Sequence, residues 1–113
     1  MPSLFTKIMR GELKGTIVHQ DEHCAVLVDI KPEAPSHFLV VPKKEIQSLA
    51  TAAPEDQLVL GHLLLVAARV AREQGFAENG YRVAINIGDD GGQTVPHLHI
   101  HVLGGRTFNW PPG

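Results

Sequence analysis

The chain has 113 residues, of which 43% are hydrophobic and 19% charged, and this length suits one folded domain spanning residues 1–113. Its formal net charge of −2 excludes a protein that coats nucleic acid, because such proteins carry a basic excess. The longest apolar run, Leu63–Ala68, is too short to span a membrane, and a lone cysteine, Cys24, suits a reducing compartment, so we expect a cytoplasmic protein.

The N-terminal segment predicts a short helix followed by a β-hairpin. It lacks the basic-then-apolar pattern of a signal peptide. Ser3 is placed to cap a helix that runs through Arg10 and ends at Gly11. Two apolar runs, 16–19 and 24–28, flank a polar turn and predict two antiparallel strands.

The middle of the chain predicts a loop, a third strand and one long helix. Two prolines place residues 29–36 in a loop, and residues 37–41 form an apolar strand. The helix is expected over 54–74, with Thr51 as a cap or pre-cap residue and Gly75 as the C-terminal stop.

The last third predicts two more strands, 81–87 and 97–103, separated by a glycine-rich loop at 88–94. The tail, 110–113, contains two prolines and cannot be helical. These elements predict an α+β fold, in which helices cover one side of an antiparallel sheet.

The long helix is apolar around most of its circumference, and one small sheet can cover only one side of it. The residues that make it so are Leu58, Val59, Leu60, Leu63, Leu64, Leu65, Val66, Ala67, Val70 and Ala71. Small apolar side chains are tolerated at surfaces, but we favour a homodimer in which a second subunit covers the other side. Gly61 suits a close approach of two helices there.

His97, His99 and His101 alternate with Leu98, Ile100 and Val102. Alternate residues of a strand share one face, so the imidazoles are expected to line one surface, with the aliphatic side chains in the core. Ordinary strand patterning explains the triplet less well, because the polar residue usual on such a face is threonine.

Metal binding is the main alternative that the spacing leaves open. Imidazole is the commonest protein ligand for zinc, and alternate strand positions present two such ligands together. Asp89 or Asp90 would then supply a further ligand, although aspartates beside glycines more often form turns.

The glycine-rich loop favours a phosphate site over a metal site. Gly88, Gly91 and Gly92 expose backbone N–H groups that bind anions, and Gln93 and Thr94 add side-chain donors. A neutral imidazole next to such a loop is a competent nucleophile towards phosphorus.

Residues 97–103 resemble the His-φ-His-φ-His-φ-φ signature of the histidine triad (HIT) family, and the likeness covers essentially the whole chain. The segments that resemble its Hint branch are Asp29-Ile30, Ala34–Val40, Gly91–Gln93, Gly104–Arg106 and Trp110–Gly113. His101 distinguishes the chain from the transferase branch, where glutamine is typical. The tail separates it from the dinucleoside polyphosphate hydrolases.

The resemblance implies a HIT-like fold with a five-stranded antiparallel sheet, one long helix and one short helix. It implies a homodimer with a ten-stranded sheet. It also implies hydrolysis of purine nucleoside phosphoramidates, or of related nucleotidyl compounds, with no metal or other cofactor. A nucleotide-binding or interaction module with little catalytic duty is the alternative from another class, beside the zinc-binding one.

Carried over by position, the resemblance makes His99 the nucleophile on the α-phosphate. His97 orients His99, plausibly through its backbone carbonyl, while His101 and His37 contact phosphate or leaving group and manage protons. The nucleotide-binding residues implied are Gly92, Gln93 and Thr94 for phosphate or water, Asn86 for the 5′ side, Asp29 for the ribose hydroxyls, Phe5, Ile8, Leu27 and Ile30 for the base, and Trp110 for the partner subunit's site.

Three positions depart from the family pattern. Thr94 stands where serine is common and keeps the hydroxyl. Glu45 stands where relatives often carry histidine, so a proton relay through it is in doubt. Leu27 replaces a common aromatic, which weakens stacking on the base. The leaving group and the choice between adenine and guanine stay open.

Overall fold

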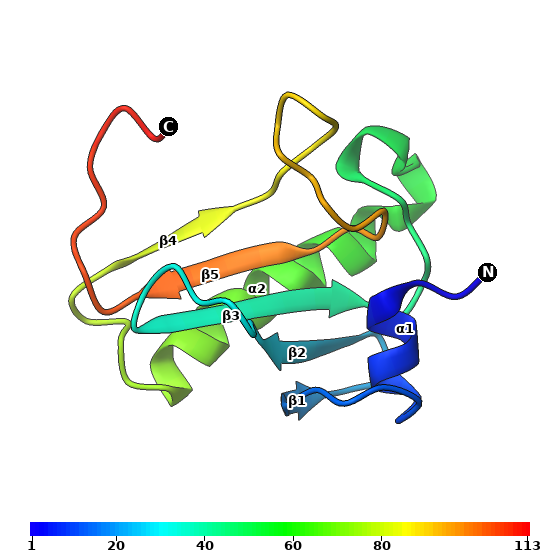
Figure 1. Ribbon diagram of the computed structural model, residues 1–113, viewed down its shortest axis with the longest axis horizontal. Helices are drawn as coiled ribbons and strands as arrows, with labels where there is room; N and C mark the ends of the chain where they lie inside the picture. The colour runs from blue at the N-terminus through cyan, green and yellow to red at the C-terminus, as the bar shows by residue number, and fades with distance from the viewer.

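A computed structural model describes all 113 residues. Its elements, in chain order, are α1 (Leu4–Met9), β1 (Ile17–Gln20), β2 (Cys24–Val28), β3 (Ser36–Pro42), the 3₁₀ turns η1 (Leu49–Thr51) and η2 (Pro54–Asp56), α2 (Gln57–Glu73), β4 (Tyr81–Ala84) and β5 (Ile100–Gly104). The strands form one antiparallel sheet in the order β1-β2-β3-β5-β4, so β1 and β4 are its edges (Figure 1). The predicted five-stranded sheet with one long and one short helix is confirmed.

The two helices lie on opposite faces of the sheet, as Figure 1 shows. Along β2, Cys24 and Val26 belong to the core beneath α2, whereas Ala25 and Leu27 pack with Phe5 of α1. Successive side chains of a strand point to opposite faces, so a strand that is apolar at every position needs cover on both. The expectation that helices cover one side only is therefore wrong.

Local sequence signals explain the ends of both helices. The Ser3 side chain accepts a hydrogen bond from the Thr6 backbone N–H at 3.1 Å and caps α1, as predicted. Gly11 and Gly75 follow the two helices with φ of 77° and 83°, the left-handed conformation that glycine adopts without strain.

The long helix begins later than predicted. Pro54 opens the turn η2 instead, and α2 starts only at Gln57. The Asp56 carboxylate accepts from the Ala53 N–H at 2.9 Å, so Asp56, rather than Thr51, organises this start.

Two strands are also shorter than predicted, because the chain leaves the sheet around the glycine-rich loop. β4 ends at Ala84, and β5 begins only at Ile100. Before β5, the Leu98 N–H donates to the Ile46 carbonyl oxygen at 2.7 Å, outside the strand ladder. The first two histidines of the triplet therefore precede the strand.

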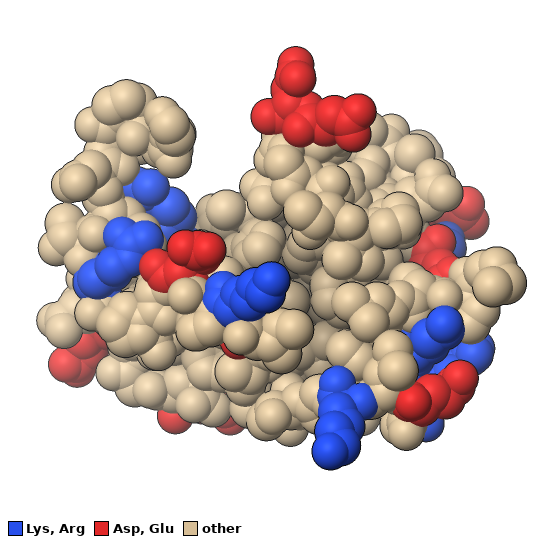
Figure 2. All heavy atoms as spheres, viewed as in Figure 1, with Lys and Arg blue, Asp and Glu red and all other residues tan.

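The outward face of α2 keeps the apolar character seen in the sequence. Leu58, Leu64 and Leu65 are 89%, 51% and 73% exposed. None of the helices has both the length and the apolar character needed to traverse a bilayer. Charges of both signs are interspersed over the opposite face, which carries α1 and has no broad basic area (Figure 2).

Candidate active site

A cavity of about 580 Å³ opens on the sheet face that carries α1. The sequence-predicted site residues that line it are Phe5, Ile8, Leu27, Asp29, Ile30, His37, Asn86, Gly92, Thr94, His99 and His101. They come from α1, β2, β3, β5 and the loops beside them. The fold thus brings most of the predicted site into one cavity.

Three imidazoles stand next to one another in this cavity. The ring centroids of His99 and His101 are 5.1 Å apart, and those of His101 and His37 are also 5.1 Å apart. The alternation of β5 sends Ile100 and Val102 into the core beneath α2 and leaves His101 on the cavity side.

His99 is held in one tautomer by a backbone carbonyl. Its Nδ1 lies 2.8 Å from the carbonyl oxygen of His97, and a carbonyl can only accept, so Nδ1 carries the proton. In the neutral ring, Nε2 then has a lone pair and no protein partner. His99 lines the cavity with that nitrogen free for an electrophile.

His97 lies on the face that carries α1, as predicted for all three imidazoles, but it does not line the cavity because the start of α1 covers it. Its ring is fully buried, with Nε2 2.8 Å from the Pro42 carbonyl oxygen and Nδ1 hydrogen-bonded to the Ser3 hydroxyl. Burial lowers the pKa of His97 and favours the neutral ring. The alternation of β5 extends back to this residue, since Leu98 joins Ile100 and Val102 in the core beneath α2 while His97 packs against Phe5.

Glu45 completes the surroundings of His97. Its carboxylate accepts from the Ser3 N–H at 2.6 Å and from the Thr6 hydroxyl at 2.7 Å, and these hydrogen bonds lower the pKa of Glu45. Glu45 therefore fastens the start of α1 next to His97. The sequence indicated no such link to Ser3, because the contact joins segments that are far apart in the chain.

His37 and His101 form a directed chain of hydrogen bonds. The Glu33 backbone N–H donates to His37 Nδ1 at 3.0 Å, so the proton of neutral His37 sits on Nε2. That Nε2 lies 2.9 Å from His101 Nδ1 and 3.3 Å from Asp29 Oδ2. When His37 donates to His101, the proton of His101 is placed on its own Nε2.

The Nε2 atom of His101 is buried and has no hydrogen-bond partner within the protein. Such an atom is costly to leave unpaired, which marks it as a donor for a bound molecule. Burial, together with the neighbouring rings of His99 and His37, lowers the pKa of His101 to about 4. His101 is therefore neutral at pH 7.

The glycine-rich loop approaches its own neighbours too closely for a side chain at one position. A Cβ on Gly91 would overlap the backbone of Ile87, and Gly92 has a φ of 79°. Gly92 and Thr94 reach the cavity, but Gln93 does not. The Gln93 amide donates instead to backbone carbonyls, so it shapes the loop rather than lining the cavity.

The apolar side of the cavity is formed by the predicted base-binding residues. The Phe5 ring lies edge-on to His99, with centroids 5.0 Å apart, and Leu27 is buried beside it. Ile30 is 86% exposed at the rim. Trp110 lies outside the cavity and is 81% exposed, so nothing within one chain covers it.

Asp29, His37 and His101 also form a set that could hold a metal ion. Their Oδ2, Nε2 and Nδ1 atoms lie within 4.8 Å of one another. The sequence did not predict this particular set, since it placed the metal alternative on the loop aspartates. Leu39, Lys14 and Glu33 also line the cavity without a sequence signal that pointed to them.

Comparison with known proteins places these features in one family. The HIT domain model matches residues 10–108. An uncharacterized HIT-like protein of Synechocystis sp. is 49% identical over 98% of this chain and 96% of that protein. A HIT family hydrolase from Legionella pneumophila superposes with a TM-score of 0.96 at 41% identity, covering 99% of this chain and 100% of that one. A histidine triad nucleotide-binding protein from Candida albicans gives 0.82 at 28% identity, covering 97% and 83%.

Proposed function

The chain belongs to the histidine triad (HIT) family, and we propose that it is a hydrolase of the Hint branch that cleaves purine nucleoside phosphoramidates through a nucleotidyl-His99 intermediate. One observation carries this proposal: the carbonyl of His97 holds the proton of His99 on Nδ1 and leaves the Nε2 lone pair free in the cavity. The relatives that are HIT family hydrolases support the hydrolytic class.

In the first step, His99 Nε2 forms a bond to the α-phosphorus while the P–N bond to the leaving amine breaks. The Nδ1–H of His99 then faces a carbonyl oxygen, which stabilises the positive charge that develops on the ring. The leaving nitrogen takes a proton that solvent supplies, and the unpartnered Nε2–H of His101 donates a hydrogen bond that stabilises the leaving group.

In the second step, water attacks the phosphorus, the bond to His99 breaks and the monophosphate leaves. One proton of that water passes to solvent, which balances the proton taken up by the amine, so the enzyme ends as it began. Backbone N–H groups near Gly92 and the hydroxyl of Thr94 are placed to bind the phosphate oxygens.

The nucleoside half is assigned to the other end of the cavity. Asp29 has an oxygen near His37, and its carboxylate is suited to accept from two ribose hydroxyls. Phe5, Leu27 and Ile30 offer an apolar slot for the base. Asn86 also lines the cavity and is assigned to the 5′ side.

We propose that the active form is a homodimer. β4 is an open edge of the sheet, where a second copy of β4 would extend it to ten strands. The exposed leucines of α2 would be covered in the same assembly. The uncovered Trp110 is then free to reach the partner's cavity.

A metal-dependent hydrolase is the second candidate, favoured by the placement of Asp29, His37 and His101. In that case a divalent ion would bind the same three side chains that we otherwise assign to the ribose and to the leaving group. The two functions differ in their response to chelation.

Hydrolysis of adenosine 5′-phosphoramidate in the presence of EDTA tests the proposal. We expect turnover by the wild-type chain, and none by His99→Ala or His99→Asn, which should still bind AMP in calorimetry. Full turnover by either variant would overturn the assignment of His99. Activity that disappears with EDTA and returns with Zn²⁺ would favour the metal-dependent enzyme, and AMP binding without any turnover would favour a binding module.

A further inference from the structure

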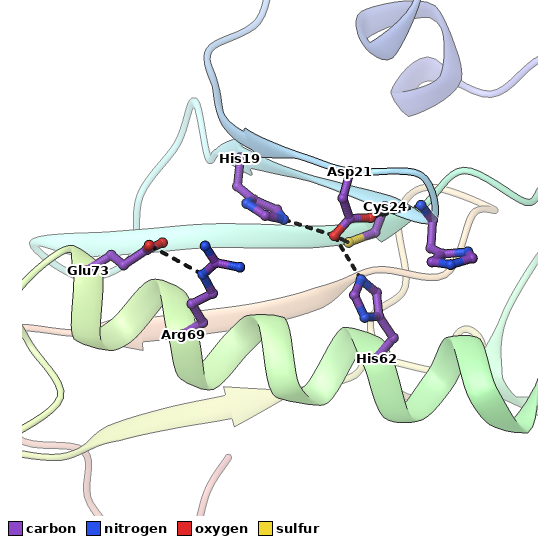
Figure 3. Close-up of polar contacts among 7 residues, drawn as sticks. His19, Asp21, Cys24, His62, Arg69 and Glu73 are labelled. Atoms are coloured by element: carbon purple, nitrogen blue, oxygen red, sulfur yellow. Dashed lines mark hydrogen bonds and ion pairs between the residues drawn. The ribbon is translucent and has the colours of Figure 1, made fainter.

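A second cluster of metal-ligating side chains lies on the other face of the sheet, between the β1–β2 hairpin and α2 (Figure 3). Asp21 Oδ2 is 2.9 Å from His19 Nε2, 2.8 Å from His62 Nε2 and 3.6 Å from Cys24 Sγ. Two imidazole nitrogens and a thiol thus converge on a single carboxylate oxygen. None of these residues lines the candidate active site.

A β-bulge brings His19 into this cluster. Ile17 lies opposite Leu27, and His19 lies opposite Val26, so the register shifts between them. In a regular strand Ile17 and His19 would share the face that carries α1. The shift turns His19 to the face that carries α2, because a bulge re-aims the side chain that follows it.

The structure assigns a divalent transition-metal site, suited to Zn²⁺, to His19, Asp21, Cys24 and His62. The donor set of two imidazoles, one carboxylate and one sulfur is borderline-soft, as zinc prefers. The proposal is independent of the function proposed for the cavity.

Three of the four donor atoms, those of His19, Asp21 and Cys24, already lie close together, whereas His62 reaches the cluster through Asp21 alone. The His62 ring must therefore turn towards the other donors to complete a four-coordinate site. Donors around tetrahedral zinc are about 3.3–3.7 Å apart. The three contacts to the Asp21 oxygen measure 2.8 to 3.6 Å, and the donor atoms of His19, Asp21 and Cys24 all lie within 4.8 Å of one another. Opening the two imidazole contacts by about half an ångström makes room for the ion.

The site is accessible from one side only. The side chains of His62, Asp21 and His19 are 34%, 27% and 17% exposed, whereas Cys24 is fully buried at the floor. An ion can therefore enter from solvent past the imidazoles and lose its water to the protein. The two backbone N–H groups of His23 and Cys24 hold the other oxygen of Asp21 and fix its orientation.

Binding of Zn²⁺ displaces a proton from the protein and changes no oxidation state. Without an ion, burial first and then the Asp21 charge raise the pKa of Cys24 to about 12, so the thiol keeps its proton. Zn²⁺ forms a bond to sulfur as the S–H proton passes to solvent. Each imidazole binds the ion through Nε2, so a proton on that nitrogen moves to Nδ1 or to solvent.

A bound ion would fasten the hairpin to α2 at His62, where the hydrogen bond to Asp21 and core packing already join the two segments. Because the ion binds the folded chain and not the unfolded one, it should raise the melting temperature. This gives the site a readout unrelated to catalysis.

Zn²⁺ titration against a chromophoric chelator tests the proposal. Every protein carries His101→Ala, which removes the other possible metal-binding set. We expect one Zn²⁺ per chain and a higher melting temperature, and His62→Gln should weaken binding by more than the roughly 10–100-fold that changes outside the first ligand shell cost. His23→Gln is the matched control: the exposed His23 ring packs edge-on against His62, with centroids 5.4 Å apart, but its side chain has no hydrogen bond to Asp21, so its loss should weaken binding far less than His62→Gln.

Co²⁺ identifies the sulfur ligand. A thiolate-to-cobalt charge-transfer absorption should be present in the parent and in His23→Gln, and absent in Cys24→Ser. Equal Zn²⁺ affinity in the parent and His62→Gln, or Co²⁺ binding without the sulfur absorption, would overturn the assignment. So would a parent that binds no Zn²⁺ at micromolar concentration, in which case the four side chains only join the hairpin to the helix.

Discussion

Backbone groups set the proton positions of His99 and His37, and the His37 ring in turn sets that of His101. The carbonyl of His97 fixes the proton of His99 on Nδ1, and the N–H of Glu33 excludes a proton from Nδ1 of His37. Backbone groups do not titrate, so these assignments persist over the whole pH range in which the rings are neutral. The result is a nucleophilic nitrogen on His99 beside a donor on His101.

The pH dependence of the free energy of unfolding should show that burial keeps His101 neutral. Its pKa is about 4 in the folded chain and 6.5 in the reference state, so above pH 6.5 both states are neutral and the group contributes no pH dependence. As the pH falls from 6.5 towards 4, the unfolded chain binds a proton that the folded chain does not, and stability is lost. Urea unfolding at pH 7.5 and 5 should show a smaller loss for His101→Gln than for wild type.

The control for that comparison is His23→Gln, which changes an exposed histidine on the hairpin turn. It should keep the wild-type difference between the two pH values. An equal difference in His101→Gln and wild type would show that the His101 ring is not held neutral by the fold.

From the sequence, the set of residues that line the cavity was easier to predict than the hydrogen bonds that hold each of them. The spacing of the histidines and the loop glycines carries chemistry that is visible in the sequence. The anchoring of His97 by Ser3 and Pro42 is not visible there, because it depends on where segments far apart in the chain come together.

At the scale of elements, we propose that the loop before β5 positions the phosphate. Gly91 packs against the backbone of Ile87, and the Gln93 amide closes the loop onto the carbonyl oxygens of Gln47 and Val95. This packing leaves the backbone near Gly92 facing the cavity.

Gly91→Ala should displace this loop, because the new Cβ would overlap the Ile87 carbonyl group. A misplacement of about 1 Å can cost on the order of 100-fold in rate, so we expect kcat/KM to fall by tenfold or more. Asp90→Ala, on the exposed tip of the same loop, should keep wild-type kinetics. Unchanged kinetics in Gly91→Ala would mean that the loop does not position the phosphate.

The ends of elements could be predicted where neighbouring residues in the chain determine them, as with the Ser3 cap of α1 and the Gly75 stop of α2. The start of α2 and the limits of β4 and β5 were not, because hydrogen bonds from outside each element decide them. The position of α1 was also missed. A helix of this length gives no signal for which face of a sheet it covers, and only the packing of Phe5 against Leu27 does so.

At the scale of the whole molecule, the proposed dimer explains what one chain leaves uncovered. The open edge of β4, the exposed leucines of α2 and the exposed Trp110 all lack a partner within the chain. Light scattering should therefore give a mass of twice 12.3 kDa. Replacing Leu64 and Leu65 together with glutamate should yield a folded monomer, because both side chains lie on the surface of α2.

Trp110 should act across the dimer. Trp110→Ala should lower kcat/KM, and a heterodimer co-expressed from His99→Ala and Trp110→Ala chains should regain activity. One of its two sites combines an intact His99 with an intact Trp110 from the other chain. Activity no higher than that of the two parents would place Trp110 outside the partner's site.

The central claim is that His99 becomes covalently nucleotidylated without help from a metal. Mass spectrometry of the protein, quenched during turnover of adenosine 5′-phosphoramidate in EDTA, tests it most directly. We predict a transient adenylyl adduct on His99 that is absent from His99→Ala. An adduct on another residue, or turnover that requires added Zn²⁺, would contradict the account.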